Sequence, residues 1–187
     1  MRRRQPSVTS QLRNLPTAAD QPLDAFFRQR ESARRRTAKT SPATASGPYP
    51  GDFTGRPVLR YQADYGRWPS PGEVVWAWVP FTDDYAAGKD RPVLIISRDE
   101  THAPVRWLLA LPLSSVDHSD LPDDEAWLSL GCGDWDERGR ESFAQIDRIV
   151  RVDPRRVRRS GGHVTQPSFD RVAAELRRQQ RPAQRRT

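Results

Sequence analysis

Residues 71–97 decide the fold class, and they read PGEVVWAWVPFTDDYAAGKDRPVLIIS. The first part, Glu73–Val79, alternates around a valine and two tryptophans, which is typical of a β-strand. The last part, Pro92–Ser97, is a continuous aliphatic run that indicates a second, buried strand. The polar, glycine-containing segment from Phe81 to Asp90 predicts a loop between them. Two strands in 27 residues favour a β-sheet protein.

The chain beyond this stretch continues the strand pattern. Arg106–Leu113, Ala126–Leu130 and Ser142–Val152 each predict a further strand, and Gly, Pro and Asp residues separate them. Five or six short strands in about 80 residues indicate a small β-barrel or sandwich.

A helix is predicted at the C-terminal end. Phe169, Val172, Ala173 and Leu176 are spaced to form one apolar stripe, and Thr165 is placed to cap the helix before Pro167. We expect this helix to pack on the barrel.

Length and composition divide the chain into three parts. It has 187 residues, of which only 35% are hydrophobic, so part of the chain is not expected to fold. We expect a basic, largely disordered N-terminal extension and linker over residues 1–68, a barrel domain with its helix over 69–181, and a basic tail over 182–187. Order should begin at Pro71–Gly72.

Charge is unevenly distributed along the chain. Residues 1–68 carry a net charge of +8, residues 69–151 carry −8, and residues 152–187 carry +7. Basic arms attract polyanions such as nucleic acid. The alternative is that they only keep the protein soluble. The acidic middle, by contrast, should repel RNA.

Several functional classes lack their signatures. The single cysteine, Cys132, excludes an internal disulfide and a cysteine-rich zinc site, and the three histidines lie far apart. No apolar run approaches the ~20 residues of a membrane span, and no secretory signal is present. We therefore expect a cytoplasmic protein that uses no metal or cofactor and contacts no membrane.

The tryptophans offer stacking surfaces for single-stranded nucleic acid. Trp76 and Trp78 lie at alternate positions of one predicted strand, so we expect both in the core. Trp135 follows Gly133 and Asp134 in a predicted turn, and we expect its ring to be exposed.

Four blocks in the same order resemble the PemK/MazF family of toxins, also described as Kid/CcdB-like. They are Gly72–Trp76, the Arg91–Pro92 entry to the aliphatic strand, Pro112–Ser114 and Asp147–Asp153. The resemblance covers residues 70–180. It implies an SH3-like barrel, a homodimer, a cognate antitoxin that binds operator DNA with the toxin, and metal-independent cleavage of single-stranded RNA.

The resemblance also assigns candidate site residues. The family's catalytic arginine, threonine and acidic residue fall on Arg91, Ser114 and Asp147. Candidate substrate-binding residues are Asp84, Lys89, Ser115, Arg148 and Trp135.

The side chains of Arg91, Ser114 and Asp147 suit the metal-independent cleavage of RNA. Without a metal, the RNA 2′-OH can attack the adjacent phosphate. Arg91 supplies a charged donor fork for the phosphate oxygens. The Ser114 hydroxyl orients the 2′-OH or donates a hydrogen bond to the phosphate. Asp147 accepts the 2′-OH proton or holds Arg91 in place.

The chain departs from the family pattern in the loop before Arg91, which lacks the usual Glu-Gln and any histidine, and at two positions of the last motif. Arg148 stands where glutamine is usual, and Val150 stands where arginine is usual. These departures leave two alternatives open. One is a barrel that has lost catalysis and binds nucleic acid or protein, and the other is an SH3-like protein-interaction module.

Overall fold

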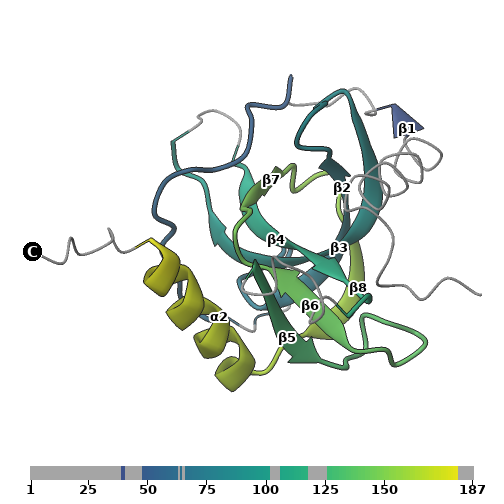
Figure 1. The fold of residues 1–187 in the computed structure, drawn as a ribbon, viewed down its shortest axis with the longest axis vertical. Helices are drawn as coiled ribbons and strands as arrows, with labels where there is room; N and C mark the ends of the chain where they lie inside the picture. The colour runs from purple at the N-terminus through teal and green to yellow at the C-terminus, as the bar shows by residue number, and fades with distance from the viewer. Residues whose placement is uncertain are drawn as a thin grey trace, which may run out of the picture. The chain divides into compact units, whose positions relative to one another are not determined.

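The computed structural model describes residues 39–40, 48–62, 64, 66–101, 106–117 and 126–180. Most of the expected N-terminal extension, and the tail over 182–187, lie outside these residues. The described chain is mainly β, a curled antiparallel sheet that forms a half-barrel with a helix at its C-terminal end (Figure 1). The predicted fold class, a small barrel with a C-terminal helix, is confirmed.

Within the described residues the sheet has eight strands, and each pairing between them is antiparallel. They are β1 (Lys39–Thr40), β2 (Glu73–Pro80), β3 (Ala87–Arg98), β4 (Leu108–Ser114), β5 (Trp127–Gly131), β6 (Ser142–Gln145), β7 (Val150–Val152) and β8 (Arg158–His163). Their order is β5-β6-β4-β3-β2-β8, and β1 pairs with β3 while β7 pairs with β4.

The hairpin of β2 and β3 is longer than predicted. Strand β3 begins at Ala87, and the β2–β3 ladder runs to Pro80 opposite Gly88. The expectation that the loop extends to Asp90 is therefore wrong. The polar residues at the start of β3 pair with β2, but they lie beyond the last β3–β4 pair, Val93 with Pro112. Charged side chains are tolerated there because this end of the strand is only partly covered.

The predicted strand Ser142–Val152 is two strands, β6 and β7. Strand β6 pairs with the end of β4 at Leu113 and Ser114, whereas β7 pairs with its beginning at Leu108–Ala110. A turn between Ile146 and Ile149 takes the chain from one end of β4 to the other. Both arrangements bury the same apolar residues, so hydrophobic pattern alone does not distinguish them.

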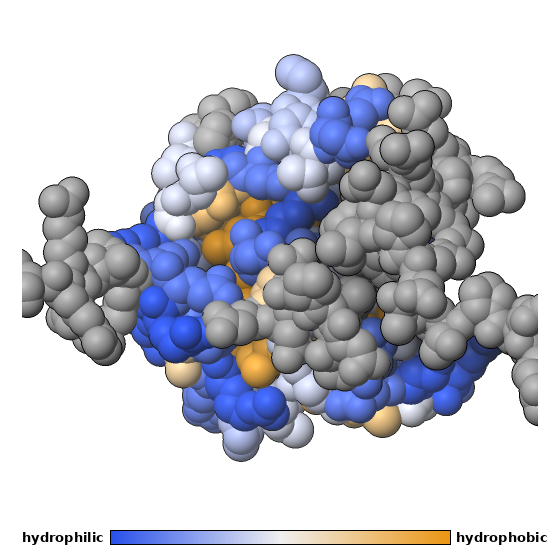
Figure 2. Space-filling view, viewed as in Figure 1, coloured by the Kyte–Doolittle hydropathy of each residue, from blue (hydrophilic) through white to orange (hydrophobic). Residues whose placement is uncertain are grey.

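Alternate residues of the central strands enter two buried clusters. Leu94 and Ile96 of β3 belong to one, and Val93 and Ile95 belong to the other. The helix α2 (Gln166–Gln179) covers the first cluster with the predicted apolar stripe, since Phe169, Val172, Ala173 and Leu176 are all buried. Its outward surface is hydrophilic in Figure 2, and apolar residues show between it and the strands.

The predicted N-cap is confirmed. The Thr165 hydroxyl accepts a hydrogen bond from the Ser168 N–H at 3.3 Å, which satisfies one donor of the first turn. No helix among the described residues is long and apolar enough to cross a membrane.

Residues 48–62, which we call the strap, pack on the half-barrel. The Phe53 N–H donates to the Ile149 carbonyl at 2.8 Å, and the Tyr61 hydroxyl donates to the Val164 carbonyl at 3.0 Å. Figure 1 shows this segment running toward the C-terminal end of α2, where Arg56 donates to the Gln180 carbonyl at 3.3 Å. Order therefore begins before Pro71, earlier than the sequence indicates.

Candidate functional site

A pocket of about 860 Å³ lies where β3 and β4 separate. Its lining comes from β2, the start of β3, the end of β4, the β5–β6 loop and β8. The residues are Trp76, Lys89, Asp90, Arg91, Pro92, Leu113, Ser114, Ser115, Val116, Asp134, Trp135, Asp136, Glu137, Arg138, Arg140, Ser142 and Arg158. It contains five of the eight candidate residues: Lys89, Arg91, Ser114, Ser115 and Trp135.

The end of the β3–β4 ladder explains why Arg91 and Ser114 line the same pocket. Val93 is opposite Pro112 in the antiparallel β3–β4 ladder. Beyond this last pair the two strands separate, and both Arg91, two residues before Val93, and Ser114, two residues after Pro112, line the pocket between them. The Ser114 Oγ accepts a hydrogen bond from the Val116 N–H at 3.1 Å, which fixes the hydroxyl at the end of β4.

The pocket lies beside an open edge of β3. On the β4 side, β1 pairs with Ala87 and Gly88, and β4 pairs from Val93 onward. Among the described residues no strand occupies that side of Lys89–Pro92. Consecutive residues of β3, from Lys89 to Pro92, therefore line the pocket.

The pocket wall carries both signs of charge. The Asp136 carboxylate accepts hydrogen bonds from the Arg138 N–H and the Arg140 Nε, both at 2.9 Å. The backbone bond from Arg138, followed by the bond from Arg140, lowers the pKa of Asp136. Across the pocket, Arg158 lies 3.5 Å from an Asp90 oxygen.

The tryptophans do not follow the sequence expectations. Trp135 is only 6% exposed, because its ring folds back over Gly133 and its Nε1 donates to the Ser142 Oγ at 2.9 Å. A β-carbon on Gly133 would lie 2.2 Å from that ring, so the glycine is the sequence signal for this packing. Trp76, expected in the core, is 36% exposed in the pocket.

Three candidate residues lie outside the pocket lining: Asp84, Asp147 and Arg148. Asp84 accepts a hydrogen bond from the Ala86 N–H at 2.9 Å in the β2–β3 loop. Asp147 is exposed in the turn between β6 and β7.

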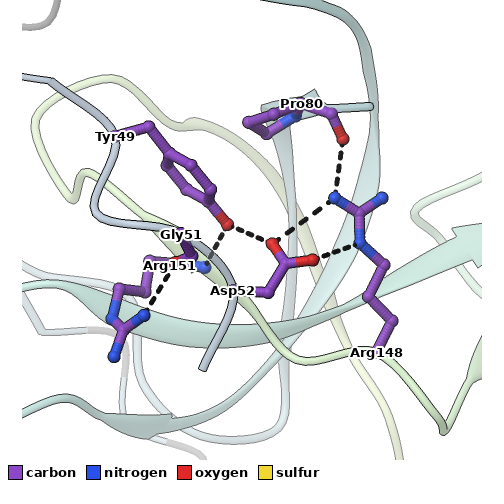
Figure 3. Close-up of polar contacts among 6 residues, drawn as sticks. All are labelled: Tyr49, Gly51, Asp52, Pro80, Arg148 and Arg151. Atoms are coloured by element: carbon purple, nitrogen blue, oxygen red, sulfur yellow. Dashed lines mark hydrogen bonds and ion pairs between the residues drawn. The ribbon is translucent and has the colours of Figure 1, made fainter. Parts of the chain in front are cut away.

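Arg148 holds the strap instead of facing the pocket (Figure 3). Its Nε donates to an Asp52 oxygen at 2.7 Å, and its guanidinium also donates to the Pro80 carbonyl at 2.8 Å. The Tyr49 hydroxyl donates to the other Asp52 oxygen. Burial, and then this bond to Asp52, raise the pKa of Tyr49. The arginine that replaces the usual glutamine thus has a structural partner in a segment that the family motifs do not cover.

A second buried arginine completes this attachment. Arg151 donates to Asp99 at 2.6 Å and to the Gly51 carbonyl at 2.7 Å, and both charged side chains are buried. Neither Arg151 nor Asp99 was a candidate, because a single charge in a strand pattern does not reveal its partner 52 residues away.

The described residues hold no group of three or more His, Cys, Asp or Glu side chains placed to bind a metal ion. Cys132 is exposed and is a free thiol.

Comparison with known proteins places the chain in a family. A search of curated proteins found no match. The family model described as PemK-like, MazF-like toxin of type II toxin–antitoxin system matches residues 70–179, which is more than half of the chain and contains the whole pocket. The chain therefore belongs to the family of PemK-like, MazF-like toxins of type II toxin–antitoxin systems.

Proposed function

We propose that this toxin is an endoribonuclease that cuts single-stranded RNA in the pocket beside β3. The observation that carries the proposal is that Arg91 and Ser114, an always-charged donor fork and a hydroxyl, line one open pocket. Membership of a toxin family supports it.

The reaction we propose uses the RNA's own nucleophile. The 2′-oxygen forms a bond to the adjacent phosphorus as the bond to the 5′-oxygen breaks, which leaves a 2′,3′-cyclic phosphate and a 5′-hydroxyl. The 2′-OH loses its proton to a base, and the departing 5′-oxygen gains one. The Arg91 guanidinium stabilises the charge on the phosphorane oxygens, and the Ser114 hydroxyl orients the 2′-OH or donates to the phosphate.

The proton acceptor in this proposal is a carboxylate of the pocket lining. Asp147, the candidate from the family pattern, is outside the pocket lining. Of the carboxylates in the lining, Asp136 already accepts two hydrogen bonds, whereas Asp134 and Glu137 are exposed. We assign proton transfer to this wall, with Asp134 and Glu137 as the residues to test.

The partners in the proposal follow from the family. They are a cognate antitoxin, operator DNA bound together with it, and a second copy of the chain in a homodimer, all in the cytoplasm. The alternative, a barrel that binds nucleic acid without cutting it, retains the same pocket but has no turnover.

The deciding experiment uses a mixed-sequence single-stranded RNA with the full chain in excess EDTA. Wild-type protein should cut the RNA, and a substrate with deoxyribose at the cut nucleotide should resist, because the nucleophile is missing. Arg91→Ala should slow cleavage by roughly 10²-fold or more. Ser114→Thr should retain activity, and Ser114→Ala should lose less than Arg91→Ala.

Arg98→Ala is the matched control, because Arg98 is exposed on the same strand and lies outside the pocket lining. It should leave the rate unchanged. RNA that stays intact with wild-type protein at micromolar concentration would refute the enzyme. Equal loss in Arg91→Ala and Arg98→Ala would refute this site.

A further inference from the structure

Strand β2 is buried along most of its length, yet it presents one large aromatic ring to the pocket. Val75, Ala77 and Val79 are 0–1% exposed, whereas Trp76 between them is 36% exposed. The strand alternates, and Val74, on the same face as Trp76, is completely buried. Exposure of the indole is therefore a property of its place in the sheet.

The neighbours of Trp76 leave its ring accessible. In the sheet Trp76 pairs with Pro92 of β3 on one side and with Arg158 of β8 on the other. The side chain of Arg158 is itself 63% exposed. Apolar residues Pro92, Leu113 and Trp135 line the same pocket as several charged residues, so the accessible indole has both kinds of neighbour there.

Trp76 and Arg91 are adjacent in register but occupy opposite faces. Ala77 is paired with Arg91 and Trp76 with Pro92, so alternation places the indole on one face of β3 and the guanidinium on the other. Both residues line the pocket. A nucleotide at this edge can therefore present its phosphate to Arg91 and its base to Trp76.

We propose that Trp76 is the platform on which one base of the bound single strand stacks, next to the phosphate that Arg91 contacts. This inference rests on the proposed function and adds a binding residue to it. Stacking on an aromatic ring contributes about 1–3 kcal/mol per base and tolerates any base, because each base has a flat π-face. Arg158 beside the ring supplies positive charge for the neighbouring phosphate.

The test measures binding of a mixed-sequence single-stranded DNA 12-mer, which lacks the 2′-OH and is not consumed. Trp76→Leu keeps an apolar side chain but removes the π-face, and it should weaken binding by roughly 5- to 150-fold. Trp76→Phe should keep most of the affinity. Trp68→Leu is the matched control, because Trp68 is 40% exposed and outside the pocket lining.

Two further readouts separate stacking from a structural role. An abasic 12-mer of the same length should bind wild-type protein and Trp76→Leu equally, since only the base contacts the indole. The DNA should quench the tryptophan fluorescence of wild-type protein more than that of Trp76→Phe. Circular dichroism and urea midpoints identify any variant that fails to fold.

The outcomes distinguish this inference from the proposed function. Equal DNA binding by wild-type protein and Trp76→Leu, together with RNA cleavage that depends on Arg91, overturns the platform and leaves the enzyme. An equal loss of affinity for the abasic strand also overturns it. A wild-type protein that neither binds the DNA nor cuts RNA overturns both.

Discussion

Removing the Asp99 carboxylate should severely destabilise the domain. Asp99 accepts a 2.6 Å hydrogen bond from Arg151, and it also accepts bonds from the Thr101 N–H and hydroxyl. The Asp99 side chain is 0% exposed and that of Arg151 is 7% exposed. In Asp99→Ala the Arg151 guanidinium keeps its bond to the Gly51 carbonyl but loses its counter-charge inside the protein.

Breaking a buried ion pair by deleting one partner costs about 3–5 kcal/mol, because the remaining charge is left uncompensated. Domains of this kind have a total unfolding free energy of about 5–15 kcal/mol, so the loss is a large fraction of it. At about 2–4 °C per kcal/mol, the melting temperature should fall by roughly 6–20 °C.

The same pair predicts a pH dependence. Burial alone would raise the pKa of Asp99, but the bonds from Arg151 and Thr101 outweigh burial and hold that pKa well below its usual range. The unfolded chain therefore takes up protons at a higher pH than the folded protein does. The pair's contribution is complete above about pH 4 to 5 and is lost as the pH falls further, so stability should decline less steeply with acid in Asp99→Ala.

Urea titration monitored by tryptophan fluorescence measures both the loss of stability and its pH dependence. Asp136→Ala is the control, because its partner Arg140 is 51% exposed, and it should change stability far less. Asp99→Ala/Arg151→Met removes the uncompensated charge and should recover part of the loss. A loss below about 1 kcal/mol in Asp99→Ala, or no recovery in the double variant, would refute the reasoning.

Three further changes test the strap and the helix, each by urea titration. Arg148→Ala should lower the unfolding free energy by about 1.5–3 kcal/mol, because the charged bond to Asp52 is lost. Altered RNA binding with wild-type stability would instead show that Arg148 is a substrate-binding residue. Gly72→Ala should cost about 1–3 kcal/mol, since Gly72 has a φ of 103° and a β-carbon there would lie 2.5 Å from the Tyr61 ring; a neutral result would show that the strap can move aside. Thr165→Ala should cost about 1 kcal/mol by removing the N-cap, and no change would mean that water replaces the hydroxyl.

Local sequence patterns predict most helices and strands of this fold, but they do not predict which strands pair. The helical stripe from Phe169 to Leu176 and its Thr165 cap depend on neighbours in sequence, and both are confirmed. The start of β3 at Ala87 depends on pairing with β2, and the division of Ser142–Val152 depends on the two ends of β4. These are contacts across the sheet, which residue periodicity does not encode.

The site shows the same division. Arg91 and Ser114 belong to recognisable motifs, and both line the pocket at the end of the β3–β4 ladder. Asp147 lies in a motif too, but the turn after β6 carries it outside the pocket lining. The family motif predicts Arg148 as substrate-binding, and its partner Asp52 could not be foreseen because it lies 96 residues earlier, in a segment with no strand or helix pattern.

The acidic middle of the chain is compatible with RNA binding once its charges are placed in space. Residues 69–151 carry a net charge of −8, but the pocket lining has five basic and four acidic residues. Two of those carboxylates, Asp90 and Asp136, lie against Arg158 and Arg140. Screening confines electrostatic attraction to about 8–10 Å at physiological salt, so a phosphate in the pocket responds to this local balance more than to the net charge. The charge of the pocket lining, close to balance, therefore opposes a bound phosphate less than the net charge of −8 suggests.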